Sequence, residues 1–151
     1  MCGIFGVVSS RPLEKNIEKN LFQVFDSLKH RGPDAKGNYL NEKAILIHTR
    51  LAIIEVEKNI QPITTKDGRY TLIFNGQIFN YKELNRELSG LGYKIEGTGD
   101  AETILYGYIK WGEKVCNYLN GMFAFAIYDS KEESIFLGRD RLGIKPLFYF
   151  K

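Results

Sequence analysis

The chain has 151 residues, of which 44% are hydrophobic and 26% charged, an ordinary composition for one globular domain. The net charge is only +3 and the basic residues are scattered, which argues against nucleic-acid binding and against binding to a membrane surface. Two cysteines are too few for a disulfide framework, and the longest apolar run, Met122–Tyr128, is too short to span a membrane. We therefore expect a soluble, cytoplasmic domain.

The first eight residues predict a short strand with a cysteine directly before it. They have no basic region and no long apolar region, so we do not expect a signal peptide. Because Cys is a small residue, we expect an aminopeptidase to remove Met1, which would leave Cys2 with both a thiol and a free α-amine. An α-amine has a usual pKa near 8 and can serve as the base for a neighbouring thiol. A buried structural thiol at the end of an edge strand is the alternative.

Three segments predict helices. Apolar residues at helical spacing predict the first over Pro12–Lys29, and the Gly-Pro pair that follows ends it. The second is expected over Tyr81–Ser89, capped by Asn80. The third is expected to follow Asp100, which would cap it, and to run to about Trp111.

Short apolar runs between turn residues predict strands. They are expected at Asn38–Leu40, Ala44–His48, Leu51–Val56, Arg69–Phe74, Tyr93–Glu96, Gly121–Asp129, Ser134–Arg139 and Leu147–Phe150. The strand that ends at Phe74 runs into Asn-Gly, which is a strong turn signal. Many short strands and three helices, without a repeat or a linker, favour an α+β fold with two packed sheets over a βαβ array.

Polar residues at the ends of these elements are suited to binding glutamine. The Asn75 amide and the Gly76 N–H could supply the two donors of an oxyanion hole, or could form an ordinary hairpin turn. Arg50 could pair with a carboxylate or be a solvated turn residue, and Asp100 could hold an ammonium group or only cap its helix. Together with the thiol and amine of Cys2, they match what is needed to bind a zwitterionic amino acid and attack its side-chain amide.

Sequence motifs along the whole chain carry a resemblance to a known family. They are Met1-Cys2-Gly3-Ile4-Phe5-Gly6, His30-Arg31-Gly32-Pro33-Asp34, His48-Thr49-Arg50-Leu51, Gln61-Pro62, Phe74–Asn80, Gly99-Asp100-Ala101-Glu102, Leu119–Phe125 and Gly138–Leu147. In these motifs and in their order, the chain resembles the class II glutamine amidotransferases, which are N-terminal-nucleophile enzymes. It is most similar to the glutaminase domain of glutamine-hydrolysing asparagine synthetases.

The resemblance implies a role for each candidate residue. Cys2 would be the nucleophile, with its own amine as base, and Asn75 with the Gly76 N–H would form the oxyanion hole. Arg50 would bind the α-carboxylate of glutamine and Asp100 its α-ammonium group. The remaining residues, Arg31 and Asp34, would support the loop near the nucleophile.

The resemblance also implies an architecture and an activity. The fold would be a four-layer αββα sandwich, with two antiparallel sheets between helical layers, here shortened at its C-terminus. Residues 1–151 would form one glutaminase domain that releases ammonia from L-glutamine and needs no cofactor and no metal. ATP and Mg would be needed only by a synthetase domain, or by another acceptor-activating enzyme, that receives the ammonia. We expect no such domain in this chain, because no Ser-Gly-Gly-x-Asp loop occurs, and we expect an incomplete sheet to favour self-association.

Some features leave other interpretations open. Gln77 stands where the asparagine-synthetase branch usually carries Glu, and a neutral amide cannot offset the charge of a substrate ammonium group. A stand-alone or catalytically silent glutamine-binding domain, serving for example a sugar or lipopolysaccharide amidation, is the alternative function. A redox protein that uses Cys2 and Cys116 lacks a C-x-x-C motif, and zinc binding lacks ligand spacing. We expect His30 and His48 to be structural residues bonded to loop backbone.

Overall fold

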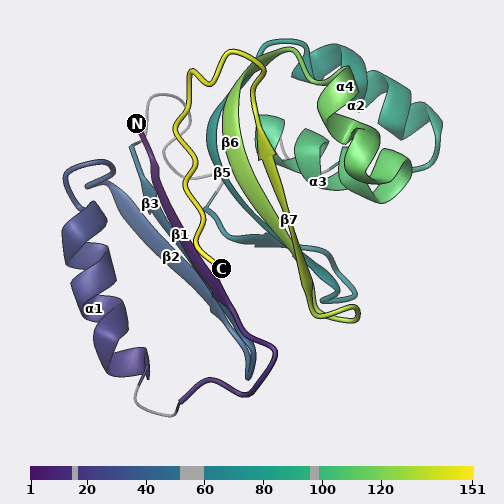
Figure 1. Cartoon of the computed structure of the whole chain (residues 1–151). Coiled ribbons are helices and arrows are strands. Elements are labelled where there is room, and N and C mark those ends of the chain that lie inside the picture. Colours follow the sequence, from purple (N-terminus) through teal and green to yellow (C-terminus); the bar gives the residue numbers. More distant parts are fainter. Residues whose placement is uncertain (15–16, 52–59, 96–98) are drawn as a thin grey trace.

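Two antiparallel sheets form the centre of this computed structural model, which describes residues 1–14, 17–51, 60–95 and 99–151 (Figure 1). The first sheet has the spatial order β1 (Gly3–Val8), β3 (Ala44–Arg50) and β2 (Ala35–Leu40). The second has the order β4 (Ile63–Thr64), β5 (Tyr70–Ile78), β6 (Gly121–Asp129) and β7 (Ser134–Arg139). The longest pairing joins β5 to β6 along all nine residues of each strand.

Helices cover the outer faces of both sheets (Figure 1). They are α1 (Ile17–Leu28), α2 (Tyr81–Gly90), α3 (Asp100–Trp111), a 3₁₀ turn at Gly112–Lys114 and α4 (Val115–Tyr118). Helix α1 lies on the first sheet, where the Thr49 hydroxyl donates a hydrogen bond to the Leu28 carbonyl. Helices α2, α3 and α4 pack on the second sheet through a core that includes Phe74, Ile104 and Phe125. The order helix, sheet, sheet, helix confirms the predicted αββα sandwich.

Apolar side chains join the two sheets. Ala44 and Leu46 of β3 pack against Ile73 of β5 and Ala126 and Tyr128 of β6. Since side chains alternate along a strand, this contact identifies the inner face of each sheet. The apolar cluster occupies the part of the inter-sheet space near the chain reversal between β2 and β3.

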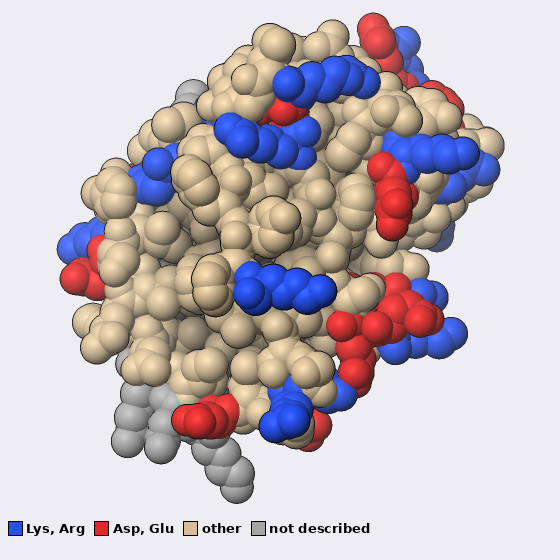
Figure 2. Space-filling view, viewed as in Figure 1, with Lys and Arg blue, Asp and Glu red and all other residues tan. Residues whose placement is uncertain are grey.

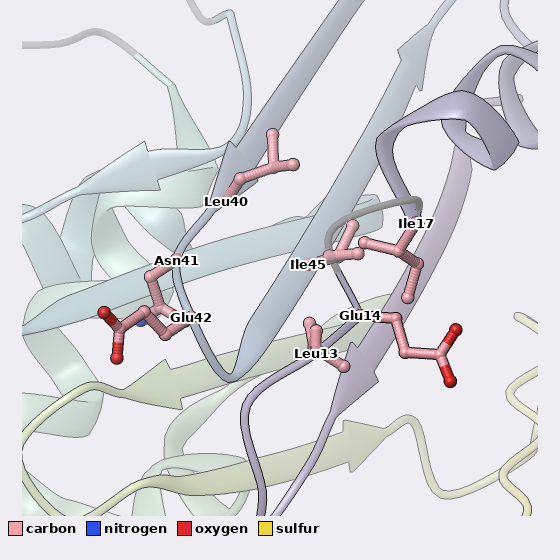
Figure 3. Close-up of a pocket in the computed structure, with 7 residues that line it drawn as sticks. All are labelled: Leu13, Glu14, Ile17, Leu40, Asn41, Glu42 and Ile45. Carbon is pink, nitrogen blue, oxygen red and sulfur yellow. The ribbon is translucent and has the colours of Figure 1, made fainter.

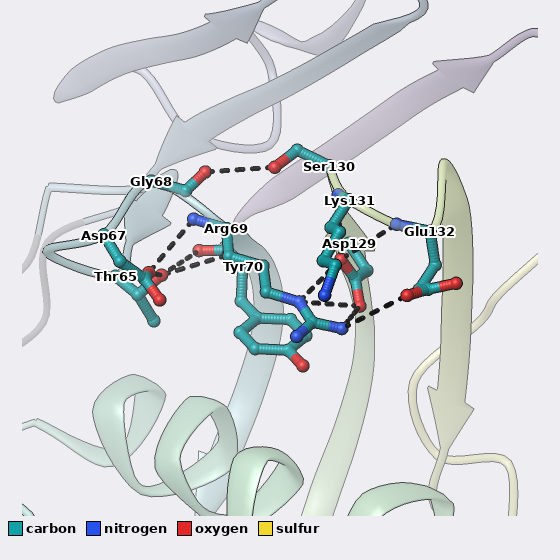
Figure 4. Close-up of polar contacts among 9 residues, drawn as sticks. All are labelled: Thr65, Asp67, Gly68, Arg69, Tyr70, Asp129, Ser130, Lys131 and Glu132. Atoms are coloured by element: carbon teal, nitrogen blue, oxygen red, sulfur yellow. Dashed lines mark hydrogen bonds and ion pairs between the residues drawn. The ribbon is translucent and has the colours of Figure 1, made fainter.

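An ion pair ties the ends of β5 and β6 together (Figure 4). The Arg69 guanidinium donates through Nη2 to Asp129 Oδ2 at 2.7 Å and through Nε to Asp129 Oδ1 at 3.0 Å. Asp129 also accepts hydrogen bonds from the backbone N–H groups of Lys131 and Glu132. These bonds hold the pKa of the Asp129 carboxyl below its usual value, the Arg69 hydrogen bond being the largest cause.

The structure corrects several predicted elements. The first helix begins at Ile17, because Pro12–Glu14 is not helical, and β5 does not end at Phe74 but continues through Asn75 and Gly76. No strand is assigned to Tyr93–Ile95 or to Leu147–Phe150, and the third helix is capped by Gly99 rather than by Asp100.

Other predictions held or fall outside the described ranges. The strands Gly121–Asp129 and Ser134–Arg139 are confirmed with the predicted bounds, and the third helix ends at Trp111 as predicted. Residues 52–56 of the strand expected at Leu51–Val56 lie outside the described residues, as does Glu96 of the one expected at Tyr93–Glu96. None of the helices in the described ranges has the length and apolar character needed to cross a bilayer.

Candidate active site

Cys2 lies directly before β1 and contacts the loop that follows α1. Its side chain is half-buried, and its carbonyl oxygen accepts a hydrogen bond from Arg31 Nε at 3.2 Å. The loop is fixed in turn by a bond from the Asp34 N–H to the Arg50 carbonyl at 3.0 Å. A Cβ at Gly32 would collide with the Thr49 carbonyl, so only glycine lets the loop approach β3 this closely. Of the predicted loop residues, Arg31 therefore contacts Cys2 itself, whereas Asp34 contacts Arg50 at the end of β3.

Strand register places Cys2 and Arg50 on the inner face of the first sheet. Ile4 pairs with His48, and Gly3 pairs with Thr49. One more step along this register brings Cys2 opposite Arg50, on the same face as Ile4 and His48. Ile4 packs against the inter-sheet apolar cluster, so this face is turned towards the second sheet. Arg50 is 7% exposed, which excludes the solvated turn residue considered from the sequence.

Asn75 and Gly76 belong to the second sheet and lie inside β5. Asn75 pairs with Ala124 and Gly76 with Phe123, so the predicted turn is wrong. Asn75 follows Ile73 by two residues and thus lies on the inner face, where it is only 5% exposed. A Cβ at Gly76 would collide with the Met122 carbonyl oxygen, which accounts for the glycine without any turn.

Gln77 and Asp100 lie at the end of β5. Gln77 is exposed and pairs with Met122 of β6. Asp100, the first residue of α3, accepts a hydrogen bond from the Ile78 N–H through Oδ2 at 2.9 Å. Burial raises the pKa of the Asp100 carboxyl above its usual value, and the bond from Ile78 acts in the opposite direction. Asp100 thus connects α3 to the strand that carries Asn75.

The segment after β7 returns to the start of the chain. Asp140 accepts hydrogen bonds from the N–H groups of Phe123 and Lys145, at 3.2 and 3.0 Å. Lys145 Nζ lies 3.0 Å from the Met1 sulfur, and the Lys145 side chain is buried. Because Phe123 pairs with Gly76, this segment lies between the end of β5 and β6 and the N-terminus.

His48 differs from its prediction. It lies within β3, 1% exposed, and its imidazole is hydrogen-bonded to the backbone of Phe74 in strand β5, not to a loop. Burial lowers the pKa of His48 to about 4, with a smaller contribution from the Arg50 charge, so the ring is neutral at physiological pH. Its Nε2 has no hydrogen-bond partner among the described residues. The only signal in the sequence is that His48 follows an apolar run. That signal does not distinguish a bond to loop backbone from a bond to the backbone of a neighbouring strand.

Gln61 is the second residue whose role was missed. In the sequence, Gln61-Pro62 is recognisable only as part of a motif. In the structure Gln61 is 7% exposed, and its Oε1 accepts a hydrogen bond from the Phe74 N–H at 2.6 Å. Gln61 and His48 therefore contact the residue immediately before Asn75.

The alternative sites receive no support from the geometry. Burial raises the pKa of the Cys116 thiol, which lies in α4, and a raised pKa makes a thiol less reactive. Across the described ranges, no group of three His, Cys, Asp or Glu side chains is arranged to hold a metal ion. Figure 2 shows acidic and basic side chains interspersed over one face of the molecule, without a continuous basic patch.

A shallow hollow lies away from the predicted site (Figure 3). It is lined by Leu13, Glu14, Ile17, Leu40, Asn41, Glu42 and Ile45. Leu40 and Ile45 are paired at the end of β2 and β3 opposite to Arg50, and Ile45 faces α1. The hollow contains none of the predicted site residues, and we assign no function to it.

Comparison with known proteins decides the family. The glutamine amidotransferase domain family matches residues 1–151. This chain belongs to the glutamine amidotransferase domain family. Among its relatives, asparagine synthetase [glutamine-hydrolyzing] 3 of Bacillus subtilis is 39% identical over 153 residues, covering 100% of this chain and 25% of the relative. Asparagine synthetase B [glutamine-hydrolyzing] of Escherichia coli is 38% identical, and the match covers 98% of this chain and 26% of the relative.

Solved structures support the fold of this amidotransferase domain. The glutamine phosphoribosylpyrophosphate amidotransferase from B. subtilis, complexed with ADP and GMP, superposes with a TM-score of 0.75 and 19% identity, over 97% of this chain and 38% of the other. A structure described as the allosteric regulatory enzyme of purine biosynthesis superposes with a TM-score of 0.76 and 18% sequence identity. The amidotransferase domain thus spans about a quarter of the length of the asparagine synthetases and less than half of these two chains.

Proposed function

We propose that this amidotransferase domain hydrolyses the side-chain amide of L-glutamine to glutamate and ammonia, with Cys2 as its nucleophile. The observation that carries the proposal is that Cys2 and Arg50 lie on the face of the first sheet that is turned towards β5, where Asn75 is buried on the opposing face. His48, two residues before Arg50, bonds to the backbone of Phe74, the residue before Asn75. A thiol, a buried guanidinium and a buried amide are the groups that attack an amide, bind a carboxylate and stabilise an oxyanion. The names of the related asparagine synthetases, which are described as glutamine-hydrolysing, support the same reaction.

The reaction proceeds in two acyl-transfer steps once Met1 has been removed. The free amine of Cys2 takes the thiol proton as the sulfur attacks the amide carbon. The carbon–nitrogen bond then breaks, the amine returns the proton to the departing nitrogen, and ammonia leaves a γ-glutamyl thioester. Water attacks the thioester, releasing glutamate and restoring the thiol. In both steps Asn75 and the Gly76 N–H donate hydrogen bonds to the oxyanion.

Residues around the nucleophile bind the rest of the substrate. Arg50 pairs with the α-carboxylate of glutamine, and Asp100 pairs with its α-ammonium group. Gln77 contributes a neutral contact beside Asp100. Arg31 and Asp34 hold the loop against the segment that carries Cys2, and the bond from Arg31 Nε to the Cys2 carbonyl supports this role.

The ammonia serves an asparagine-synthetase-type reaction in the cytoplasm. Residues 1–151 form the glutaminase domain and use no cofactor, whereas ATP and Mg belong to a synthetase domain or an acceptor-activating enzyme that receives the ammonia. Phe148, Tyr149 and Phe150 are 91%, 79% and 101% exposed, and such exposed aromatic side chains support self-association or docking to a partner domain.

Alkylation with 6-diazo-5-oxo-L-norleucine, a reactive glutamine analogue, tests the proposal. Intact mass measured before and after treatment should show a chain that lacks Met1 and gains a single adduct, located on Cys2 and prevented by excess glutamine. The Cys116→Ser variant is the matched control and should react at the parent rate. The Cys2→Ser variant should take no adduct.

Two results contradict the proposal. An adduct on Cys116, or on Cys2 without protection by glutamine, would mean that no glutamine site has formed around Cys2. A chain that has lost Met1, binds glutamine and takes no adduct would support the catalytically silent binding domain instead, serving another amidotransferase such as a sugar or lipopolysaccharide amidation system.

A further inference from the structure

The main-chain ladder beside β5 stops before it reaches Asn75. On this side β4 pairs only Ile63 with Leu72 and Thr64 with Thr71. The same register would bring Pro62 opposite Ile73, and proline has no N–H to donate. Among the described residues, the edge of β5 that faces β4 therefore has no strand partner at Phe74, although β6 pairs with β5 along its whole length on the other side.

Two buried side chains occupy the place of the missing strand. Gln61 Oε1 accepts a hydrogen bond from the Phe74 N–H at 2.6 Å. The His48 imidazole is bonded to the Phe74 backbone as well, and since the N–H is already donated to Gln61, the ring donates to the Phe74 carbonyl. Gln61 and His48 are 7% and 1% exposed, so water does not compete for either bond.

The two side chains come from different parts of the fold. His48 belongs to the first sheet, whereas Gln61 precedes the second. A Cβ at Gly37, which pairs with His48 in β2, would collide with the Gln61 carbonyl, so this glycine lets Gln61 lie close to the first sheet. The first sheet and the segment before β4 thus hold the two peptide groups on either side of Phe74.

The buried imidazole of His48 lowers the stability of the fold at one of its two nitrogens. Its Nε2 is the one buried side-chain polar atom without a partner in the described part of the chain. An unpaired buried polar atom destabilises a protein, and an apolar side chain at position 48 would avoid this. The imidazole therefore needs a compensating role, and its bond to Phe74 is the contact that supplies one.

We propose that His48 and Gln61 are positioning residues that fix the two peptide groups flanking Phe74 and thereby orient the Asn75 amide and the Gly76 N–H towards the oxyanion. The inference rests on the proposed function, because it assigns the oxyanion contact to Asn75 and Gly76. Oxyanion donors act only within a narrow range of distances, so a small displacement of β5 lowers the rate of acyl transfer. In the proposed function Arg50 and Asp100 bind the substrate, so we expect a loss of the bonds to Phe74 to lower the rate more than the affinity.

Paired variants test the inference. Gln61→Met and His48→Leu remove the acceptor and the donor, whereas Gln61→Glu and His48→Asn keep an acceptor and a donor at similar positions. We expect kcat for glutamine hydrolysis to fall about 10- to 100-fold in the first pair, with KM changed less than about threefold, and to recover most of that loss in the second pair. The control is Ile104→Val in α3, which is fully buried in the outer core and should leave kcat unchanged.

Amide hydrogen exchange supplies a readout that does not need activity. Exchange at Phe74, Asn75 and Gly76 should be faster in Gln61→Met and His48→Leu than in Gln61→Glu, His48→Asn and Ile104→Val. A merely structural role would raise exchange throughout the sheet or lower the melting temperature without the selective loss of kcat.

The outcomes separate the inference from the proposed function. If the parent chain is not alkylated at Cys2 by the glutamine analogue, the proposed function fails and the inference fails with it. If the parent reacts, but Gln61→Met and His48→Leu keep the parent kcat or change only KM, the inference alone is overturned.

Discussion

Asn75 is a polar side chain on the inner face of β5 and is only 5% exposed. Buried amides are costly unless they are hydrogen-bonded, so a role in binding an oxyanion gives this side chain a function that an apolar residue could not fill. The Asn75→Ala variant should lower kcat by about 10²- to 10³-fold while KM for glutamine changes little. Steady-state glutaminase kinetics measure both, with Asn117→Ala in α4 as a surface control. A large rise in KM at unchanged kcat would assign Asn75 to substrate binding instead.

Gln77 is the residue at which the charge of the site can be changed without disturbing the core, because its side chain is exposed. A carboxylate there would add a second negative group beside Asp100 for the substrate ammonium. Exposed ion pairs are worth roughly 0.2–1 kcal/mol, so Gln77→Glu should tighten glutamine binding by up to about fivefold. Isothermal titration of glutamine into a Cys2→Ser background measures this, and Gln77→Met is the uncharged control. Equal affinity in all three chains would mean that residue 77 does not face the ammonium group.

The strand β5 is the element that brings the site together. It carries Asn75 and Gly76. At its last residue, Ile78, the backbone N–H donates a hydrogen bond to Asp100. At Phe74 its backbone is hydrogen-bonded to the side chains of His48 and Gln61. Its close approach to β6 requires glycine at position 76, since a Cβ would lie 2.7 Å from the Phe123 Cα and 2.8 Å from the Phe74 ring. The backbone of this strand, and not only its side chains, is therefore part of the site.

Replacing Gly76 by alanine should damage both stability and activity. The added methyl group would force β5 away from β6, and overpacking of this kind costs about 1–3 kcal/mol. Thermal unfolding and glutaminase kinetics measure the two effects. Gly90→Ala in α2 is the matched control, because a Cβ there meets no atom within 4 Å and should leave activity unchanged. A Gly76→Ala chain with the parent kcat would show that β5 can shift without moving the oxyanion donors.

Local patterns predicted the elements whose partners lie nearby in the sequence. The hairpin of β6 and β7 and the helix α3 follow from alternation and helical spacing, which are local properties. The predicted turn at Asn75-Gly76 was wrong. Gly76 is needed because a side chain there would collide with the Met122 carbonyl of β6, and a contact with such a distant part of the sequence leaves no local signal. Leu147–Phe150 has strand-forming residues but no strand beside it in the described ranges.

The candidate site could be predicted in its residue types but not in its supports. Cys2, Arg50 and Asp100 stand at the ends of predicted elements, where such side chains are visible in the sequence. The roles of His48 and Gln61 depend on the packing of one sheet against the other and on the start of β4 at Ile63, which leaves Phe74 beyond the ladder. Both arise only in the assembled sandwich.

The candidate site and the Arg69–Asp129 ion pair lie at opposite ends of β5. Asn75 and Gly76 lie near the end at Ile78, whereas Arg69 and Asp129 join β5 to β6 at the other end, where Tyr70 pairs with Asp129 (Figure 4). The apolar cluster between the sheets separates the two regions. Stability and catalysis should therefore respond to different substitutions.

The Asp129→Asn variant tests this separation through its dependence on pH. The folded pKa of Asp129 lies below its usual value, so the carboxylate stabilises the fold above that usual value, near 3.8, and this contribution is lost as the pH falls through the folded pKa. Asp129→Asn should lower the melting temperature at pH 7, and the difference from the parent should shrink as the pH falls below about 3.8. Melting curves between pH 2 and 7 measure it, with the exposed Glu87→Gln in α2 as control. At pH 7 and at a temperature where both chains are folded, Asp129→Asn should keep the parent kcat; a selective loss of kcat would mean that the ion pair acts on the site through β5.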